Sequence, residues 1–194
     1  LLVSPAKKQH FELRIRIPGW LSAPVPGDLY RYATTEKEVP VIEVNGKPVQ
    51  YDVASGYAVV KRVWKKGDIV TMDLPMKVKR IVSNQAVKQN KNRIALQYGP
   101  LVYCVEGASD EFDAGGVIVP DGTAFEISYE PSLLGGINVL RFEAPVVTVS
   151  KDGLSVTTFR KKITAIPYFS WNNRGASEMQ VWLPSSIQKI SINE

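Results

Sequence analysis

Strict alternation of apolar and polar residues is the feature that most constrains the fold of this chain. In the segment HFELRIRI (10–17), Phe11, Leu13, Ile15 and Ile17 alternate with polar or charged residues. Successive side chains of a β-strand point to opposite faces of the sheet, so this segment has one apolar and one polar face. The pattern predicts a strand of an antiparallel sheet whose apolar face covers a core, while Arg14 and Arg16 point away from it.

Turn signals separate further runs of the same kind. The pair Asn45–Gly46 lies between two β-rich runs and is typical of a tight hairpin. Gly99–Pro100 divides residues 92–107 into two strand segments, and no convincing amphipathic helix of ten or more residues appears. We therefore expect an all-β fold of antiparallel β-sandwiches, as sandwich or jelly-roll-like domains. The further expected strands are 56–64, 68–76, 125–129, 137–144, 145–149, 154–168, 179–184 and 187–192.

The amino-acid composition of the chain changes after Gly107. Residues 108–116 (ASDEFDAGG) are acidic and glycine-rich, which favours a linker. This predicts two domains, a middle accessory β-sandwich over 1–107 and a C-terminal β-sandwich over 108–194. One continuous sandwich that shares strands across this point is the alternative.

Charge and hydropathy argue against two classes of partner, and a basic groove that forms only in three dimensions stays an open alternative. The net charge of +5 comes from short groups such as KVKR (77–80) and FRKK (159–162), without a block of five or six like charges. This pattern is typical of solvated strand faces and argues against a nucleic-acid partner. No run approaches the roughly 18 apolar residues of a membrane span, so no membrane partner is expected. The start LLVSPAKK has neither an initiator Met nor a signal-peptide pattern, and we expect a piece of a longer protein. The compartment stays open: periplasmic or extracellular if the parent carries a signal peptide, otherwise cytoplasmic.

Candidates for catalysis and metal binding are few. His10 is the single histidine and lies on the polar face of its strand, which favours a surface residue. Cys104 is the single cysteine, so an internal disulfide and a multi-cysteine zinc site are excluded. Its apolar neighbours in LVYCVE predict a small buried side chain rather than a reactive thiol.

Five carboxylates are candidates for a catalytic pair or a calcium site. Asp110, Glu111 and Asp113 cluster in the acidic segment but lack EF-hand spacing, which favours a solvated loop. Glu106 and Glu178 are isolated in sequence. We predict neither a catalytic residue nor a metal ligand in this chain.

Aromatic residues give the least generic stretch, IPYFSWNNRGASEMQVWLP (166–184). Aromatic rings stack on sugar rings, and neighbouring amides and guanidinium groups bond sugar hydroxyls. The same rings also pack cores and domain interfaces, and both readings stay open. The candidate carbohydrate-binding or inter-domain residues are Trp20, Tyr168, Trp171, Asn172 and Arg174, with Arg174 expected to anchor the Asn-Asn-Arg-Gly turn.

Five motifs in a fixed order carry a resemblance to a known family. They are LRIRIPGW (13–20), VNGKPV (44–49), GYAVVKRVWKKGDIVTMDLPM (56–76), RIALQYGPLVYCVEG (93–107) and AIPYFSWNNRGASEMQVWLP (165–184). Together they resemble the C-terminal part of glycoside hydrolase family 127, the β-L-arabinofuranosidases and their relatives. The resemblance covers nearly the whole chain and is weakest over 108–150.

The resemblance implies an N-terminal (α/α)6 catalytic barrel upstream of this chain, which lacks it. It places a cysteine nucleophile, its zinc site and a glutamate acid/base in that barrel, so Cys104 does not take over the nucleophile's role. We expect no cofactor in this chain, with zinc only in the missing catalytic domain. The missing barrel is the expected partner; a carbohydrate and a second copy (a homodimer) remain candidates.

These arguments lead to three hypotheses about function. The first is a non-catalytic accessory β-sandwich region of a glycoside hydrolase acting on plant or glycoprotein arabinosides, which serves domain packing and the substrate entrance. The second is a stand-alone carbohydrate-binding module, and the third an autonomous enzyme with an unrecognised site. Residues 21–47 are longer than the usual link between PGW and VNG. This insertion is expected to reach toward a partner or substrate, and to be mobile unless Tyr30 and Tyr32 dock it.

Overall fold

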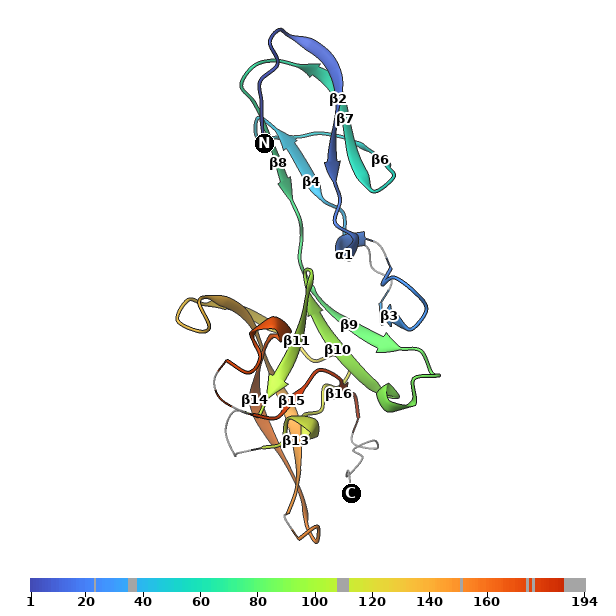
Figure 1. The fold of residues 1–194 in the computed structure, drawn as a ribbon, viewed down its shortest axis with the longest axis vertical. Helices are drawn as coiled ribbons and strands as arrows, with labels where there is room; N and C mark the ends of the chain where they lie inside the picture. Colours follow the sequence, from blue (N-terminus) through green and yellow to red (C-terminus); the bar gives the residue numbers. More distant parts are fainter. Residues whose placement is uncertain are drawn as a thin grey trace. The chain divides into compact units, whose positions relative to one another are not determined.

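The computed structural model describes residues 1–22, 24–34, 38–107, 112–150, 152–173, 175 and 177–186. The described chain is built from antiparallel β-strands in two compact units (Figure 1). Unit 1 comprises Leu1–Pro24 and Thr35–Lys77, and unit 2 comprises Val25–Thr34 and Val78–Glu194. The expected all-β antiparallel fold is confirmed. The described helices are the four-residue α1 (Gly19–Ser22) and three 3-10 turns, and none is long and apolar enough to cross a membrane.

Unit 1 is formed by two small sheets. One has the order β2 (Gln9–Arg16), β7 (Tyr57–Trp64), β6 (Asp52–Ala54); the other has the order β1 (Leu2–Val3), β8 (Asp68–Asp73), β4 (Val41–Val44), β5 (Lys47–Pro48). A single apolar cluster joins Val60 and Trp64 of β7 to Ile42 of β4 and Val70 of β8. Because both sheets contribute to one core, unit 1 is a sandwich.

The alternation that defined the first expected strand is confirmed in β2. Phe11, Leu13 and Ile15 pack against the core of unit 1, whereas Arg14 and Arg16 are exposed. Strand β7 pairs antiparallel with β2 and ends at Trp64, which is fully buried. The indole Nε1 of Trp64 donates a hydrogen bond to the Phe11 carbonyl at 3.1 Å, so the polar atom of this large core residue is satisfied.

The predicted hairpin at Asn45–Gly46 is also confirmed. Both residues have positive φ, 55° and 73°, as a tight turn between twisted strands requires. The Asn45 side chain donates to Asp68 Oδ1 and accepts from the Ile69 amide, both at 2.9 Å. The Asn45 amide and the Lys65 backbone N–H lower the pKa of the buried Asp68 carboxyl, since both donate to it.

Unit 2 is dominated by one large sheet. Its order is β12 (Glu126–Glu130), β13 (Ile137–Val149), β14 (Val156–Pro167), β11 (Leu101–Glu106), β10 (Arg93–Tyr98), β9 (Val78–Ser83) and β3 (Tyr30–Tyr32), with β15 (Met179–Gln180) on β11 and β16 (Leu183–Pro184) on β10. Two expected strands, 137–144 and 145–149, form the single strand β13, which runs through Pro145. The expected strand 187–192 lies outside the described residues.

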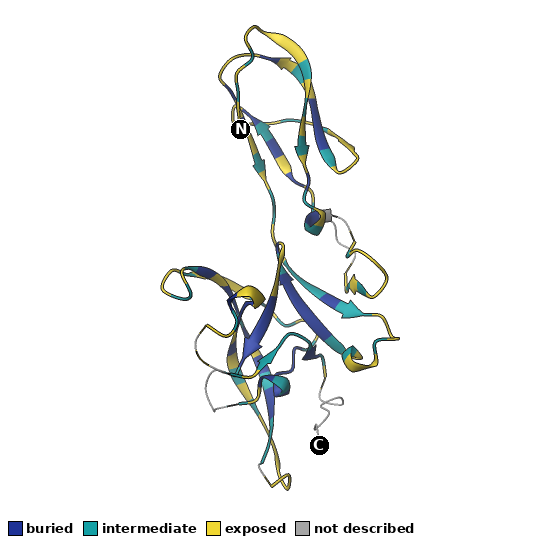
Figure 2. Cartoon of the chain, in the orientation of Figure 1, coloured by how far each residue is buried: buried dark blue, intermediate teal, exposed yellow. Residues whose placement is uncertain are grey.

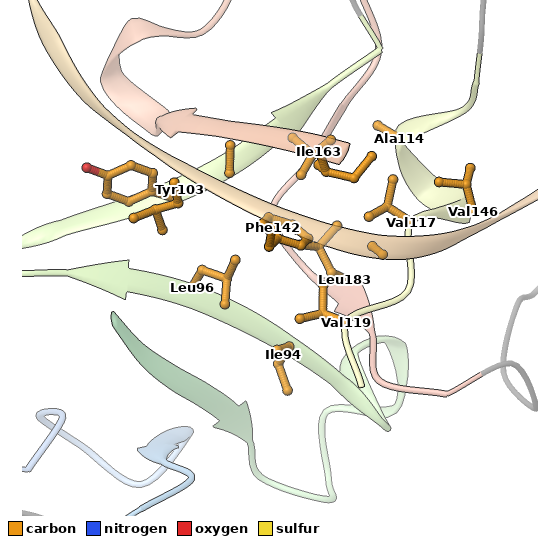
Figure 3. Close-up of a cluster of buried hydrophobic side chains, with 14 residues drawn as sticks. Ile94, Leu96, Tyr103, Ala114, Val117, Val119, Phe142, Val146, Ile163 and Leu183 are labelled. Atoms are coloured by element: carbon orange, nitrogen blue, oxygen red, sulfur yellow. The ribbon is translucent and has the colours of Figure 1, made fainter. Parts of the chain in front are cut away.

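The core of unit 2 lies between strands that are distant in sequence. Leu96 of β10, Tyr103 of β11, Phe142 of β13 and Leu183 of β16 converge on one cluster (Figure 3). The central strands β10 and β11 are buried along most of their length (Figure 2). Burial on this scale makes strands before and after residue 107 parts of one cooperative core.

The predicted boundary near residue 107 is therefore corrected. Strand β11 pairs with β14, with Tyr103 opposite Pro167 and Val105 opposite Ala165, so residues 78–106 and the later strands form one sheet. The units divide between Lys77 and Val78 instead. The described part of the expected linker holds η2 (Ala114–Gly116), whose Ala114 and Gly116 are buried. Local composition signalled a loop correctly but carried no information on which strands pair across it.

Candidate functional site

An exposed aromatic corner follows the last long strand of unit 2. Strand β14 ends at Pro167, and the 3-10 turn η3 (Tyr168–Ser170) presents two rings to solvent. Tyr168 is 48% exposed and Phe169 is 66% exposed. The Tyr168 ring stacks on Trp171 with a centroid distance of 6.3 Å and an interplanar angle of 16°. The corner therefore offers aromatic surface on a rigid turn at the end of a strand.

The base of this corner is buried. Trp171 is half-buried and packs against a cluster that includes Cys104 and Ile166. Two polar atoms, Ser170 Oγ and Trp171 Nε1, are buried without a hydrogen-bond partner among the described residues. Because buried polar groups are nearly always satisfied in native proteins, these two atoms mark the corner as a place where a partner is to be expected.

A buried carboxylate holds the turn after Trp171. Asn172 has a φ of 66°, and its backbone N–H donates to Glu106 Oε1 at 3.3 Å. Glu106 is 7% exposed and lies at the end of β11. The Asn173 side chain donates to the carbonyls of Ser170 and Trp171. Glu106 thus holds this turn at Asn172, and the prediction that Arg174 anchors the same turn falls on a residue outside the described ones.

The structure groups three of the predicted site residues. Tyr168, Trp171 and Asn172 lie on consecutive turns of unit 2. Trp20 lies in α1 of unit 1, where it is half-buried and packs against the core of that unit. Contact of any of them with carbohydrate or with another domain stays a prediction.

Apart from Glu106, the described candidates for catalysis are either buried, as Cys104 is, or exposed away from the aromatic rings. Cys104 is fully buried at 0% exposure, as expected for a structural residue. His10 is exposed on the outer face of β2. The Asp113 carboxylate lies beside Glu178 and raises the pKa of that exposed carboxyl, mainly by a hydrogen bond and like-charge repulsion. In the described parts of the chain, no three His, Cys, Asp or Glu residues form a group that could hold a metal ion.

A cationic pocket in unit 2 was missed by the sequence analysis. It has a volume of about 460 Å³ and is bordered by β3, β9, the turn η1 (Lys88–Asn90), the start of β10 and the end of β16. Four basic residues line it: Arg31, Arg80, Lys91 and Arg93. The group KVKR (77–80) was predicted to belong to a solvated strand face, and the run KQNKNR (88–93) was not singled out in the sequence. Their convergence depends on the pairing of β3, β9 and β10, which local patterns do not encode.

Arg80 lines this pocket, and hydrogen bonds hold its guanidinium group in place. Its Nη1 donates to the Val119 carbonyl at 3.2 Å and lies 3.4 Å from Asp121 Oδ1, while Nη2 donates to the Pro120 carbonyl. Its side chain is 15% exposed. Burial lowers the pKa of Arg80 and the charge of Asp121 opposes that shift, so the guanidinium stays a fixed cation.

Two family models match the chain, one before and one after residue 77, and the first also includes Val25–Thr34 of unit 2. Residues 1–76 match the model described as the GH127 middle domain of β-L-arabinofuranosidase, and residues 78–184 match the glycoside hydrolase family 127 C-terminal domain. The change from one match to the next coincides with the division between the units at Lys77 and Val78.

Individual relatives match most of the chain. The chain is 28% identical over 181 residues to a non-reducing end β-L-arabinofuranosidase of Bifidobacterium longum subsp. longum, covering 87% of this chain and 25% of that protein. A solved GH127 β-arabinofuranosidase has 35% identity and a TM-score of 0.83 over 93% of this chain and 28% of its own. A GH127 β-L-arabinofuranosidase from Geobacillus stearothermophilus T6 has 32% identity and a TM-score of 0.77, over 94% of this chain and 28% of its own. The chain thus spans about a quarter of the length of these relatives, and it belongs to glycoside hydrolase family 127.

Proposed function

We propose that this chain is a non-catalytic accessory region of a β-L-arabinofuranosidase-like glycoside hydrolase. One observation carries the proposal: the two units match the middle and C-terminal domains of the family, and together they span about a quarter of the relatives. The remaining three quarters of such a protein would hold a catalytic barrel, which is the partner that we propose for these two sandwiches.

The geometry of the described residues supports an accessory role. A nucleophile must reach the substrate, yet the thiol of Cys104 is fully buried among Ile137, Val139 and Ile166. Glu106 already accepts a backbone hydrogen bond from Asn172 and holds a turn. The residues that were candidates for chemistry therefore serve packing and turn formation.

The exposed corner at Tyr168 and Phe169 suits contact with the proposed barrel. Exposed aromatic rings on a rigid turn bury large apolar area at low entropic cost when a partner covers them. We expect this corner to support packing between domains close to the substrate entrance. The substrates of the whole hydrolase would be arabinosides of plant or glycoprotein origin.

A paired activity assay tests the proposal. The chain alone and a longer protein that includes the upstream part of its reading frame are incubated with an aryl β-L-arabinofuranoside. We expect turnover by the longer protein and none by the chain alone, because hydrolysis needs a positioned acid and a nucleophile. In the longer protein, Cys104→Ala should retain activity within about twofold as long as unit 2 folds. Turnover by the chain alone, abolished by Cys104→Ala, would contradict the accessory role.

The aromatic corner also supports a second candidate function: the chain could act as a carbohydrate-binding module. The exposed rings of Tyr168 and Phe169 favour it, since sugar rings stack on such faces. Titration of the isolated chain with arabino-oligosaccharides distinguishes the two. Binding that is lost in Tyr168→Ala and Phe169→Ala but kept in Tyr129→Ala, another exposed aromatic residue, would favour the module.

A further inference from the structure

The lining of the cationic pocket of unit 2 carries more basic than acidic residues among those that the structure describes. Asp121 is the single carboxylate among its lining residues, against four basic side chains. That carboxylate lies against Arg80. Within the described part of the chain, Arg31, Lys91 and Arg93 form no salt bridge with a carboxylate.

These three cations keep hydrogen-bond donors for a ligand. Arg93 donates through Nη1 to the Trp182 carbonyl at 2.9 Å, and its other N–H groups have no acceptor among the residues that the structure describes. In the same described part of the chain, Arg31 makes one long contact of 3.5 Å to the Tyr32 carbonyl. A guanidinium fixed on one side and free on the other is suited to bind a carboxylate in bidentate geometry.

Neutral polar groups share the same wall. The lining includes the side chains of Gln85, Asn90 and Asn92, next to Ser83 and Ser185. Their amides both donate and accept hydrogen bonds, which is the chemistry that recognises several hydroxyl groups at once. The pocket volume of about 460 Å³ is within the range of small-molecule sites and exceeds the need of an inorganic anion.

The insertion over residues 21–47 builds one side of this pocket. Its strand β3 pairs with β9, with Arg31 opposite Val82, and both Arg31 and Ala33 line the pocket. Tyr32 donates from its hydroxyl to Gln97 Oε1 at 3.3 Å, and the ammonium group of Lys79 lies 4.7 Å from the centre of its ring. Within the segment that was expected to reach toward a partner or substrate, Val25–Thr34 belongs to unit 2 and contributes a cation there.

We propose that this pocket binds an acidic saccharide, with the carboxylate of a uronosyl residue held by Arg31, Lys91 and Arg93 and its hydroxyl groups held by the amide wall. The choice of a carboxylate ligand rests on the pocket alone, whereas the choice of a saccharide also rests on the proposed function. The site would attach the protein to uronate-containing polysaccharides without taking part in bond cleavage.

Binding is tested by NMR titration of the chain with a galacturonate disaccharide, a neutral arabinose disaccharide, sodium sulfate and a tri-glutamate peptide. We expect the acidic disaccharide to bind tightest, at least about fivefold tighter than the other three, and to weaken several-fold between 20 mM and 300 mM salt as exposed charge pairs are screened. Shifted amides should belong to residues around Asn90 and Arg93. The assay involves no turnover, so its failure would leave the accessory role untouched.

Two variants that leave the fold intact sharpen this test. Arg31→Gln and Lys91→Gln each remove one exposed cation, and we expect about a threefold loss of affinity for each. Lys88→Gln is the matched control, because Lys88 is exposed on the same turn but does not line the pocket. Equal binding of the neutral disaccharide, tighter binding of sulfate or of the peptide, or equal losses in Lys88→Gln and Lys91→Gln would each overturn the proposal.

Discussion

Tyr30 stacks on Trp182, with ring centroids 5.4 Å apart and an interplanar angle of 29°. These residues are far apart in sequence but lie in the same unit, Tyr30 on β3 and Trp182 between β15 and β16. The stack explains how a short segment of three paired residues stays on the edge of a large sheet. Strand β3 alone adds few backbone hydrogen bonds, so the aromatic contact is its main side-chain anchor on this side.

The first prediction concerns this anchor. Tyr30→Ala should lower the free energy of unfolding of unit 2 by about 2 kcal/mol, because it removes both buried ring area and the stacked pair. In a double-mutant cycle with Trp182→Ala, the coupling should be about 1 kcal/mol. Urea unfolding followed by NMR signals of unit 2 measures both. Tyr129→Ala is the control, since Tyr129 is 62% exposed and should cost under about 0.5 kcal/mol. Strictly additive single-variant costs would contradict a direct stack.

Local features of this fold were predictable from the sequence, and long-range ones were not. The alternation of Phe11, Leu13 and Ile15 and the turn at Asn45–Gly46 depend on neighbouring residues alone, and both were correct. The pairing of β11 with β14 depends on contacts across some sixty residues. An acidic, glycine-rich loop between those strands looks the same whether it joins two domains or two strands of one sheet.

The candidate site residues also fall into two groups, one predictable from the sequence and one that depends on long-range pairing. Aromatic residues clustered in sequence, such as Tyr168 and Trp171, are also neighbours in space because a short turn holds them. The pocket around Arg31 and Arg93 draws on segments that are brought together only by sheet order. Scattered charges therefore gave no local signal of a site.

The second prediction tests the close packing of η2 on β13. A Cβ at Gly116 would collide with the carbonyl oxygen of Val147, which is backbone and cannot turn away. Gly116→Ala should therefore destabilise unit 2 by at least about 2 kcal/mol in urea unfolding. Gly122→Ala controls for backbone strain: it has a φ of 81° with open space around it, and should cost only about 1 kcal/mol. Gly116 itself has no positive φ, so a loss in Gly116→Ala no larger than in Gly122→Ala would contradict the collision with Val147.

The third prediction concerns the buried thiol. Cys104 is fully buried in unit 2, so a thiol reagent can reach it only when the strand opens. Labelling of the native chain should be at least about a thousandfold slower than labelling in urea, as the usual range of folding stability implies. Val63→Cys in a Cys104→Ala chain is the positive control, because Val63 is 45% exposed on β7. Fast labelling of Cys104 in the native chain would reopen a reactive role for it.

The last prediction follows from the carboxyl pair Asp113–Glu178. Asp113 accepts the Gly115 amide at 2.6 Å and lies beside Glu178, where it raises the pKa of the Glu178 carboxyl by a hydrogen bond and like-charge repulsion. The folded state thus binds the Glu178 proton more tightly than the unfolded chain does. This stabilising contribution is complete below the unfolded pKa of 4.5 and is lost as the pH rises through the higher folded pKa.

Glu178→Gln removes the like-charge repulsion between the Glu178 and Asp113 carboxylates. We expect the variant to unfold at a higher urea concentration than the natural chain at pH 7, and the difference to shrink as the pH falls toward 4.5. Urea midpoints measured from pH 4 to pH 8 give the curve. Glu126→Gln, which removes an exposed carboxylate of β12, controls for the change in net charge. Its midpoint difference should stay nearly constant over that range. A Glu178→Gln chain that is less stable than the natural chain at pH 7 would reverse the sign and show that Glu178 gains more from nearby cations than it loses to Asp113.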